Sequence, residues 1–352
     1  MNKQIAFITD EYSEAEFSSG GVKLNYALIL ELIKNGYNVD IYSKKYSMKT
    51  GIANAYYNFN ELVLIKNLKE KYDIVLSEKG IYPSDVTYIH DHSMKYRFPI
   101  MYKSKLSRFL YRVFMNKKHS IRVKRDKLIK QNLDKTDKII VSSNVLKQDI
   151  INNFNQNSDK LFILPPAVKQ NPNAEFRAKS DFTIFGLSAV GLKRKGFYEV
   201  LKATKQLRKT QKYFLVKIIY PKYKNNLLLK LYIKLNKLDK YIKFVSLQKN
   251  MDNFYETIDF MLMPSKVEPF GMVAIEAMAN YKPCLTTECC GACDIINDKN
   301  LICKEEDLAQ NMEKLINISS EDYEKMAKSV YEKVKDISWG KFCKSYIDIL
   351  QK

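Results

Sequence analysis

The chain has 352 residues, 46% of them hydrophobic, and its 59 Lys and Arg against 39 Asp and Glu give a formal net charge of +20 at pH 7. This hydrophobic content excludes a disordered chain, and the length is sufficient for two domains with separate cores. So large a positive charge predicts a polyanionic neighbour, and nucleic acid and anionic lipid are the two candidates.

The distribution of apolar residues and cysteines predicts a cytoplasmic protein. No run reaches the roughly 18 apolar residues of a membrane span, and the polar residues 1–4 are unlike the start of a signal peptide. Six cysteines in a chain without a secretion signal indicate reduced thiols.

The first residues predict one half of a Rossmann-like domain. Its expected elements are strand 5–9, polar loop 10–19, helix 22–34 and strand 37–42. The pair Gly20-Gly21 closes the loop, and glycines between a strand and a helix let a backbone approach a ligand closely. Taken alone, this pair is equally consistent with a flexible loop.

Further alternation of strands and helices predicts a parallel, doubly wound sheet. The strands are expected at residues 73–77, 86–90 and 138–142. The middle one ends in Ile89-His90-Asp91-His92, and functional residues of such sheets collect at the carboxyl ends of strands. His90 and Asp91 are therefore candidate catalytic residues, with a loop histidine of no special role as the alternative for His90. The His-x-His spacing is a weak metal signal, because His119, the only other histidine, lies in a basic segment.

Residues 95–130 form a basic segment with thirteen Lys or Arg and a single acid, Asp126. Helices broken near Pro99 are expected here, with an apolar stripe made of Phe98, Leu106, Phe109, Leu110, Val113 and Phe114. Basic helices with an aromatic side lie at anionic membrane surfaces, where each cation adds about 1 kcal/mol. The cations expected to bind the membrane are Lys103, Lys105, Arg108, Arg112, Lys117, Lys118, Arg122, Lys124 and Arg125. A solvated basic face is the alternative interpretation.

A proline pair at the end of residues 161–166 predicts the boundary between two domains, followed by a polar linker to about residue 180. Later strands are expected at 182–187, 214–219 and 242–245, and the Lys-rich helix 227–238 is expected to be solvated.

A second candidate site follows the strand 182–187, where a turn bounded by Gly191 and Gly196 precedes a helix. The turn carries Lys193, Arg194 and Lys195, which repel one another unless an anion neutralises them. Arg grips phosphate bidentately and Lys adds a compact charge. One more surface cluster in a basic protein is the alternative.

The most informative stretch is residues 263–279, Met-Pro-Ser-Lys-Val-Glu-Pro-Phe-Gly-Met-Val-Ala-Ile-Glu-Ala-Met-Ala. It follows a buried strand and predicts a tight turn and then a helix from about Gly271, whose N-terminal amides form an anion site. Glu268 and Glu276 are separated by seven residues and flank this site. A carboxylate beside a phosphate is unfavourable, so we expect these acids to hold hydroxyl groups, such as those of a nucleotide sugar.

This stretch resembles the Glu-x7-Glu motif of the retaining glycosyltransferases of family 4, with the Pro-Ser lead-in and the Pro-Phe-Gly turn. Within the family, the chain is most similar to lipopolysaccharide core glucosyltransferases. The resemblance implies the GT-B fold: Rossmann-like domains at 1–166 and 167–335 that face each other across a cleft, and a last helix, 336–352, that crosses back to the first domain. It also implies a UDP-sugar donor, retention of configuration, and a glycan or glycolipid acceptor at the inner face of the plasma membrane, where 95–130 is the membrane-facing segment.

The resemblance assigns roles to individual residues. Gly20 and Gly21 would lie against the donor pyrophosphate and the acceptor, and His90 with Asp91 near the donor sugar. Lys195 would bind the diphosphate, and Arg194 would replace an Arg that many members carry where this chain has Leu187-Ser188-Ala189. Glu268 would hold sugar hydroxyls and Glu276 the ribose. The remaining expected donor contacts are Phe270, Gly271 and Met272.

Other chemistries are less well supported by the sequence. No Asp-x-Asp motif is present, so the chain is expected to need no metal and no cofactor besides its sugar-nucleotide substrate. Cys289, Cys290 and Cys293 lack the spaced pairs of a zinc site and are expected to be free thiols in a loop. A nucleic-acid-binding protein is the rival from another class, although no zinc finger, basic zipper or RNA-binding signature is present. Capsule, teichoic acid or a protein are alternative acceptors.

Overall fold

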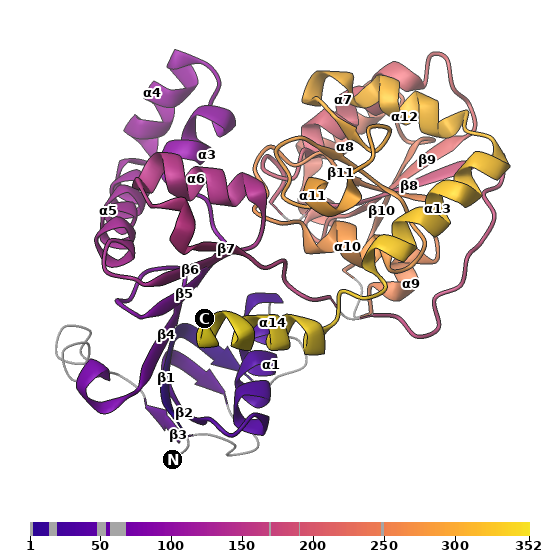
Figure 1. The fold of residues 1–352 in the computed structure, drawn as a ribbon. Coiled ribbons are helices and arrows are strands. Elements are labelled where there is room, and N and C mark those ends of the chain that lie inside the picture. The colour runs from indigo at the N-terminus through magenta and orange to yellow at the C-terminus, as the bar shows by residue number, and fades with distance from the viewer. Residues whose placement is uncertain are drawn as a thin grey trace. The chain divides into compact units, whose positions relative to one another are not determined.

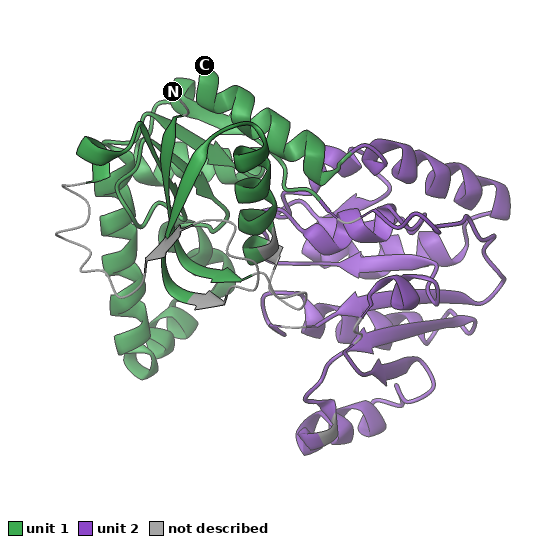
Figure 2. Ribbon diagram, turned by 90° about the horizontal axis from the view of Figure 1, so that it is seen from below, with its two compact units in different colours: residues 1–167, 337–352 green, residues 168–336 purple. Residues whose placement is uncertain are grey.

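The computed structural model describes residues 3–13, 20–47, 54–56, 68–168, 170–189, 191–247 and 250–352. It divides the chain into two compact units, which are coloured separately in Figure 2. Unit 1 consists of Met1–Ala167 and Ile337–Lys352, and unit 2 consists of Val168–Asp336. Figure 1 shows the elements of each unit in chain order.

Unit 1 contains a parallel sheet of seven strands in the order β3-β2-β1-β4-β5-β6-β7. Its strands are β1 (Gln4–Ser13), β2 (Asn38–Ser47), β3 (Asn54–Tyr56), β4 (Ile74–Glu78), β5 (Val86–Ile89), β6 (Lys138–Val141) and β7 (Leu161–Ile163). Its helices are α1 (Gly20–Lys34), α3 (Met94–Met101), α4 (Lys105–Phe114), α5 (Asn116–Leu133), α6 (Asn144–Phe154), the 3₁₀ turn η1 (Ser158–Lys160) and α14 (Trp339–Gln351). The order of the strands reverses between β1 and β4, and this switch point is where open α/β sheets bind ligands.

The start of the chain departs from the expected pattern. Strand β1 continues through Asp10 to Ser13, because it pairs with β2 as far as Ser13 opposite Ser47. The expected polar loop at 10–19 is therefore wrong for its first four residues, and its remainder lies outside the described residues. Helix α1 begins at Gly20, so both glycines belong to its first turn.

Unit 2 contains a parallel sheet of six strands in the order β10-β9-β8-β11-β12-β13. Its strands are β8 (Thr183–Ser188), β9 (Phe214–Ile219), β10 (Ile242–Val245), β11 (Phe260–Met263), β12 (Cys284–Thr287) and β13 (Ile302–Cys303). Its helices are α7 (Phe197–Leu207), η2 (Tyr223–Asn225), α8 (Leu227–Leu235), α9 (Asp252–Tyr255), α10 (Met272–Met278), α11 (Cys293–Ile296), η3 (Glu305–Asp307), α12 (Leu308–Ile316) and α13 (Ser320–Val334). The strand order again reverses between the two central strands, β8 and β11.

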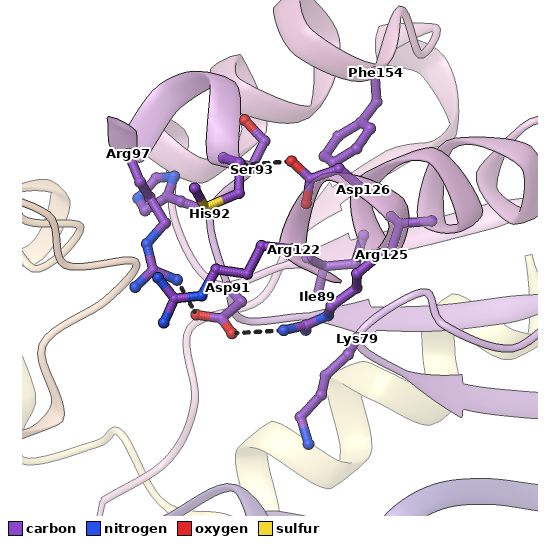
Figure 3. Close-up of a pocket in the computed structure, with 12 residues that line it drawn as sticks. Lys79, Ile89, Asp91, His92, Ser93, Arg97, Arg122, Arg125, Asp126 and Phe154 are labelled. Carbon is purple, nitrogen blue, oxygen red and sulfur yellow. Dashed lines mark hydrogen bonds and ion pairs between the residues drawn. The ribbon is translucent and has the colours of Figure 1, made fainter. Parts of the chain in front are cut away.

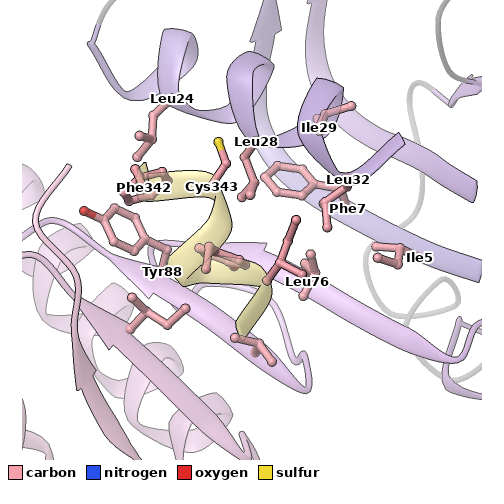
Figure 4. Close-up of a cluster of buried hydrophobic side chains, with 14 of the residues drawn as sticks. Ile5, Phe7, Leu24, Leu28, Ile29, Leu32, Leu76, Tyr88, Phe342 and Cys343 are labelled. Carbon is pink, nitrogen blue, oxygen red and sulfur yellow. The ribbon is translucent and has the colours of Figure 1, made fainter. Parts of the chain in front are cut away.

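Helix α14 belongs to the core of unit 1, as Figure 4 shows. Phe342 and Cys343 are buried with residues of α1 and of the sheet, and the Phe342 ring meets the Tyr88 ring edge-on at 6.0 Å between centroids. The Lys138 ammonium donates to the carbonyl of Ile349 at 2.9 Å, which places a positive charge at the negative end of the helix. The expected return of the C-terminal helix to the first domain is confirmed.

The basic segment 95–130 forms α3, α4 and most of α5, and Pro99 lies inside α3 rather than at a break. The break falls between Tyr102 and Ser104, where Ser104 caps α4 by accepting a hydrogen bond from the Ser107 amide. Phe98 is buried against the Tyr111 ring and does not belong to the exposed stripe. The other expected stripe residues are exposed on α4: Leu106 (67%), Phe109 (62%), Leu110 (42%), Val113 (55%) and Phe114 (77%).

Helix α8 also exposes apolar side chains, although only a solvated lysine-rich face was expected there. The exposed residues are Leu227, Leu228, Leu231, Tyr232 and Leu235. Within the described parts of the chain, no helix combines the length and the hydropathy that crossing a bilayer requires.

Candidate active site

Two loops of unit 2 converge at its switch point, because each follows one of the two central strands. The turn Gly191–Gly196 follows β8, and the stretch Pro264–Gly271 follows β11. The amide of Lys266 donates to the carbonyl of Arg194 at 2.9 Å, so the two loops are joined through their backbones. The cationic turn and the start of α10 therefore lie at one edge of unit 2.

Glycine allows this approach. Gly196 has φ +70°, and a Cβ at this position would lie 2.0 Å from the carbonyl oxygen of Pro264. Gly271 has φ +102°, and a Cβ there would lie 2.6 Å from Cε of Met263. Both glycines precede a helix, α7 and α10 respectively, and both adopt the left-handed conformation that other residues reach only with strain.

Arg194, Lys195 and Glu268 form a compact charge cluster at this edge. Oε2 of Glu268 accepts from Nη1 of Arg194 at 2.7 Å and from Nζ of Lys195 at 2.5 Å. Only 13% of the Glu268 side chain and 14% of the Lys195 side chain are exposed, against 33% for Arg194. With two cations and one carboxylate, the cluster keeps one net positive charge that faces solvent mainly through Arg194.

The binding of hydroxyl groups by Glu268 stays a prediction, and the structure adds a contact that the sequence did not indicate. Glu268 contacts both cations directly, because a carboxylate placed between two cations stabilises them and is stabilised in turn. A hydroxyl group bound by Glu268 must therefore donate its hydrogen bond mainly to the other carboxylate oxygen, Oε1.

Glu276 lies on α10 and is half-buried. Its Oε2 accepts a hydrogen bond from the Tyr255 hydroxyl at 3.0 Å. Burial, together with the nearby Glu276 carboxylate, raises the pKa of Tyr255 well above its usual value, so this hydroxyl remains a donor. Nothing in the sequence around Tyr255 indicates this role, because its only local signal is an apolar pair with Phe254.

The other expected donor contacts differ in accessibility. Phe270 is buried, and its carbonyl accepts a weak hydrogen bond from the Cys290 thiol at 3.2 Å, whereas Met272 is half-buried at the start of α10. The six cysteines are free thiols, as expected. Burial raises the pKa of Cys293 to about 12, so this thiol is protonated at neutral pH and is a poor nucleophile.

In unit 1, Gly21 and His90 lie next to each other at the carboxyl end of the sheet. A Cβ on Gly21 would lie 3.8 Å from Nε2 of His90. The imidazole is neutral, since burial lowers the pKa of His90, and its Nδ1 is a buried atom with no hydrogen-bond partner among the described residues. Gly20 takes part only through the backbone of α1, which it begins. Gly21 and His90 therefore share one small region.

A buried carboxylate that sequence reasoning missed lies in the same region. Glu78 ends β4, accepts from Thr9 and Asn25 at 2.8 Å each, and forms an ion pair with Lys79 at 2.9 Å. Only its position at the end of the strand could have drawn attention to it. This network fixes α1 to the strands on both sides of the switch point.

Asp91 contacts arginines, and its expected catalytic role stays a prediction. Its carboxylate lies 3.5 Å from Nη1 of Arg97 and 3.6 Å from Nη1 of Arg125, as Figure 3 shows. His92 is wholly buried, and its Nδ1 lies 2.8 Å from the carboxylate of Asp149. No three His, Cys, Asp or Glu side chains of the described residues are grouped as a metal site.

The nine cations expected at a membrane do not all face outward. Most are exposed, but Arg108 donates to the backbone carbonyls of Tyr102 and Lys103 at 2.9 Å each. Arg122 and Arg125 line the pocket of Figure 3. Arg125 is half-buried and pairs with Asp91 inside unit 1, while its membrane contact stays a prediction.

The fold of two Rossmann-like units, with the last helix returned to the first, is the GT-B fold of glycosyltransferases. Residues 168–333, almost the whole of unit 2, match the family model described as Glycosyl transferases group 1. A search of curated proteins gives no significant match.

Solved structures resemble the chain over its full length. The crystal structure of WaaG, a glycosyltransferase involved in lipopolysaccharide biosynthesis, matches with a TM-score of 0.71 and 18% identity over 98% of this chain and 99% of that one. The lipopolysaccharide outer core galactosyltransferase WaaB matches with a TM-score of 0.66 and 13% identity over 99% of each chain. HepE of Anabaena, in complex with UDP and glucose, matches with a TM-score of 0.67 and 14% identity over 100% of each. At these identities the likeness establishes the fold.

Proposed function

We propose that the protein is a retaining glycosyltransferase of family 4 that moves a hexose from a nucleotide-diphosphate sugar, UDP-linked by preference, to a glycan or glycolipid of the cell envelope. The observation that carries the proposal is the cluster of Arg194, Lys195 and Glu268 at the switch point of unit 2, which matches the Glycosyl transferases group 1 model. The complex of HepE with UDP and glucose supports a sugar nucleotide as the ligand of this fold.

The proposed chemistry is charge stabilisation by fixed cations. As the bond from the sugar to the diphosphate breaks, negative charge develops on the leaving phosphate, and cations already in place stabilise it without reorganising. Lys195 and Arg194 supply these charges, and the first-turn amides of α10 next to Gly271 add donors. Glu276, held by Tyr255, binds the ribose hydroxyls, and Glu268 binds the hexose through its remaining oxygen.

In the first unit, His90 and Gly21 are proposed to bind near the sugar and the acceptor. The imidazole is neutral, so it can accept or donate a hydrogen bond to a hydroxyl without repelling a cationic transition state. The first candidate acceptor is the lipopolysaccharide core, since WaaG and WaaB are lipopolysaccharide enzymes. Teichoic acid, capsule or a protein are the alternative acceptors.

The protein is proposed to work at the cytoplasmic face of the plasma membrane, held there by α4. Five exposed apolar side chains on this helix, bordered by Lys103, Lys105 and Arg112, suit an anionic lipid surface. If each exposed cation adds about 1 kcal/mol, replacing Lys117 and Lys118 together by Gln weakens binding to anionic vesicles by about 25-fold. The control is the same loss of two charges on unit 2, with the exposed Lys202 and Lys205 of α7 replaced together by Gln.

A screen of sugar nucleotides for thermal stabilisation tests the donor. UDP-hexoses are expected to raise the unfolding temperature of the wild type, and the rise should shrink in Lys195→Ala and in Glu276→Ala but not in Lys202→Ala, whose lysine is exposed on α7. Full stabilisation in both site variants would show that the site is assigned wrongly. Retarded oligonucleotides in a gel, without hydrolysis of any sugar nucleotide, would instead favour the rival nucleic-acid-binding protein.

A further inference from the structure

Unit 1 contains a pocket that the donor chemistry does not use (Figure 3). It lies beyond the carboxyl ends of β4 and β5 and is walled by α3 and α5. Its charged lining residues are Lys79, Arg97, Arg122, Arg125, Asp91 and Asp126. Lys79 is paired with Glu78 outside the pocket, so three arginines face two lining carboxylates and leave a formal excess of one positive charge.

The carboxylates neutralise these cations only in part. Lys79 is satisfied outside the pocket by Glu78 at 2.9 Å. Asp126 accepts from the amide of Met94 at 2.6 Å, which occupies one of its oxygens, and burial raises the pKa of this carboxyl above its usual value. Of the two lining carboxylates, Asp91 is the one that pairs with the arginines, Arg97 and Arg125.

The arginines have donor capacity left over. Asp91 lies 3.5 and 3.6 Å from Arg97 and Arg125, which is longer than a charge-assisted hydrogen bond. Nε of Arg125 is a buried atom and has no hydrogen-bond partner among the described residues. Arg122 donates only a long bond, 3.4 Å, to the Tyr111 hydroxyl, and no carboxylate in the described part of the chain lies within ion-pair distance of it.

Three guanidinium groups with spare donors, brought together from two helices, match one kind of ligand. A planar guanidinium binds phosphate or carboxylate through two parallel hydrogen bonds, and a phosphate monoester carries enough negative charge to offset the excess at this pocket. A phosphate monoester also offers three acceptor oxygens to the three guanidinium groups, whereas a single carboxylate offers two. Asp91, which lines the pocket, is the next residue after His90, the residue proposed to bind near the sugar and the acceptor.

We propose that the pocket of Arg97, Arg122 and Arg125 binds a phosphate group carried by the acceptor, so that the enzyme glycosylates a phosphorylated sugar. That the phosphate belongs to the acceptor rests on the proposed function, whereas the binding of phosphate to the pocket is independent of it.

The test uses the full chain labelled with ¹⁵N in its arginines. The Nε–H signal of Arg125, identified by its loss in Arg125→Lys, is followed while a hexose phosphate, inorganic phosphate or glucuronate is added. The hexose phosphate is expected to shift the signal at the lowest concentration, and the shift should persist in Lys195→Ala, which removes a cation of unit 2. A stronger response to glucuronate would overturn phosphate as the ligand, and preference for inorganic phosphate would overturn a sugar-borne one.

Variants measure how much each arginine contributes. Arg97→Gln and Arg122→Gln should each weaken binding of the hexose phosphate by about 10- to 100-fold, because each removes a charge-assisted hydrogen-bonding group. Lys127→Gln is the matched control, since this exposed lysine lies on α5 but does not line the pocket. Equal weakening in all three variants, or no response of the Arg125 signal, refutes the proposal. Conservative Arg→Lys variants replace any Gln variant that does not fold.

The same samples separate this inference from the proposed function. If UDP-hexoses stabilise the wild type and hexose phosphate does not bind, the pocket proposal alone is wrong. If hexose phosphate binds and no sugar nucleotide does, the phosphate site stands and the glycosyltransferase proposal fails.

Discussion

Gly196 connects the cationic turn to α7 at the point where it touches the loop after β11. An alanine here must accept φ near +70°, which costs about 1–2 kcal/mol. Its Cβ would also lie 2.0 Å from the carbonyl oxygen of Pro264, where real contacts stay beyond 3.0 Å, so the two loops must separate by about 1 Å. Such overpacking adds about 1–3 kcal/mol. The separation also moves Lys195 away from Glu268.

Gly191, at the other end of the same turn, provides the control. Its φ is +90°, but a Cβ there would meet nothing within 4 Å, so Gly191→Ala pays only the backbone strain. In thermal unfolding, Gly196→Ala should therefore melt roughly 3–9 °C below Gly191→Ala. Stabilisation by UDP-hexose should survive in Gly191→Ala and be largely lost in Gly196→Ala. If both variants melt together and respond equally to the ligand, contact with Pro264 does not hold the turn in place.

Four further outcomes are expected. Phe342→Ala should destabilise unit 1 by about 3–5 kcal/mol in denaturant unfolding, because it empties a core site, whereas alanine at the exposed Phe182 of unit 2 should change little. Tyr255→Phe should weaken sugar-nucleotide binding in calorimetry by about 5-fold, since Glu276 loses a hydrogen bond worth about 1 kcal/mol; unchanged affinity would remove Glu276 from the donor site. Burial holds the pKa of His90 below its usual 6.5, so below about pH 6.5 the unfolded chain binds more protons than the folded one and the free energy of unfolding of unit 1 falls on acidification. In His90→Gln this fall should be smaller. Equal falls in the variant and the wild type would contradict the buried, neutral imidazole. EDTA should leave turnover unchanged, and a loss of turnover in EDTA would contradict metal independence.

Much of the fold follows from local patterns in the sequence. Strands β9 and β10 coincide with the predicted ranges 214–219 and 242–245, because apolar β-branched and aromatic residues dominate both despite Lys217 and Lys243. The end of β1 was missed, since Asp10 and Glu11 interrupt its apolar run and only pairing with β2 holds them in the sheet. Pro99 was also misplaced: it lies inside α3, which ends two residues later at Met101, so the helix continues only briefly past it.

The site was predictable where function follows from position along a strand. Arg194, Lys195 and Glu268 could be placed because glycine turns after central strands meet at the switch point. What the side chains do to one another was not predictable. The contact of Glu268 with both cations and the bond from Tyr255 to Glu276 depend on distances across loops far apart in sequence. The sequence does not distinguish Arg97 and Arg125 from the many other cations of the basic segment. Only the backbone path of α3 and α5 shows that these two arginines line a pocket.

The return of α14 to unit 1 has a consequence for biosynthesis. Residues 168–336 are continuous, so unit 2 has its complete core before the last segment is made. The N-terminal sheet, by contrast, is translated first and receives Phe342 and its neighbours last. At roughly 5–20 residues per second, the roughly 300 residues between α1 and α14 leave the apolar face of α1 without α14 for roughly 15–60 s. During translation, we expect a ribosome-associated chaperone to bind this uncovered apolar face of α1.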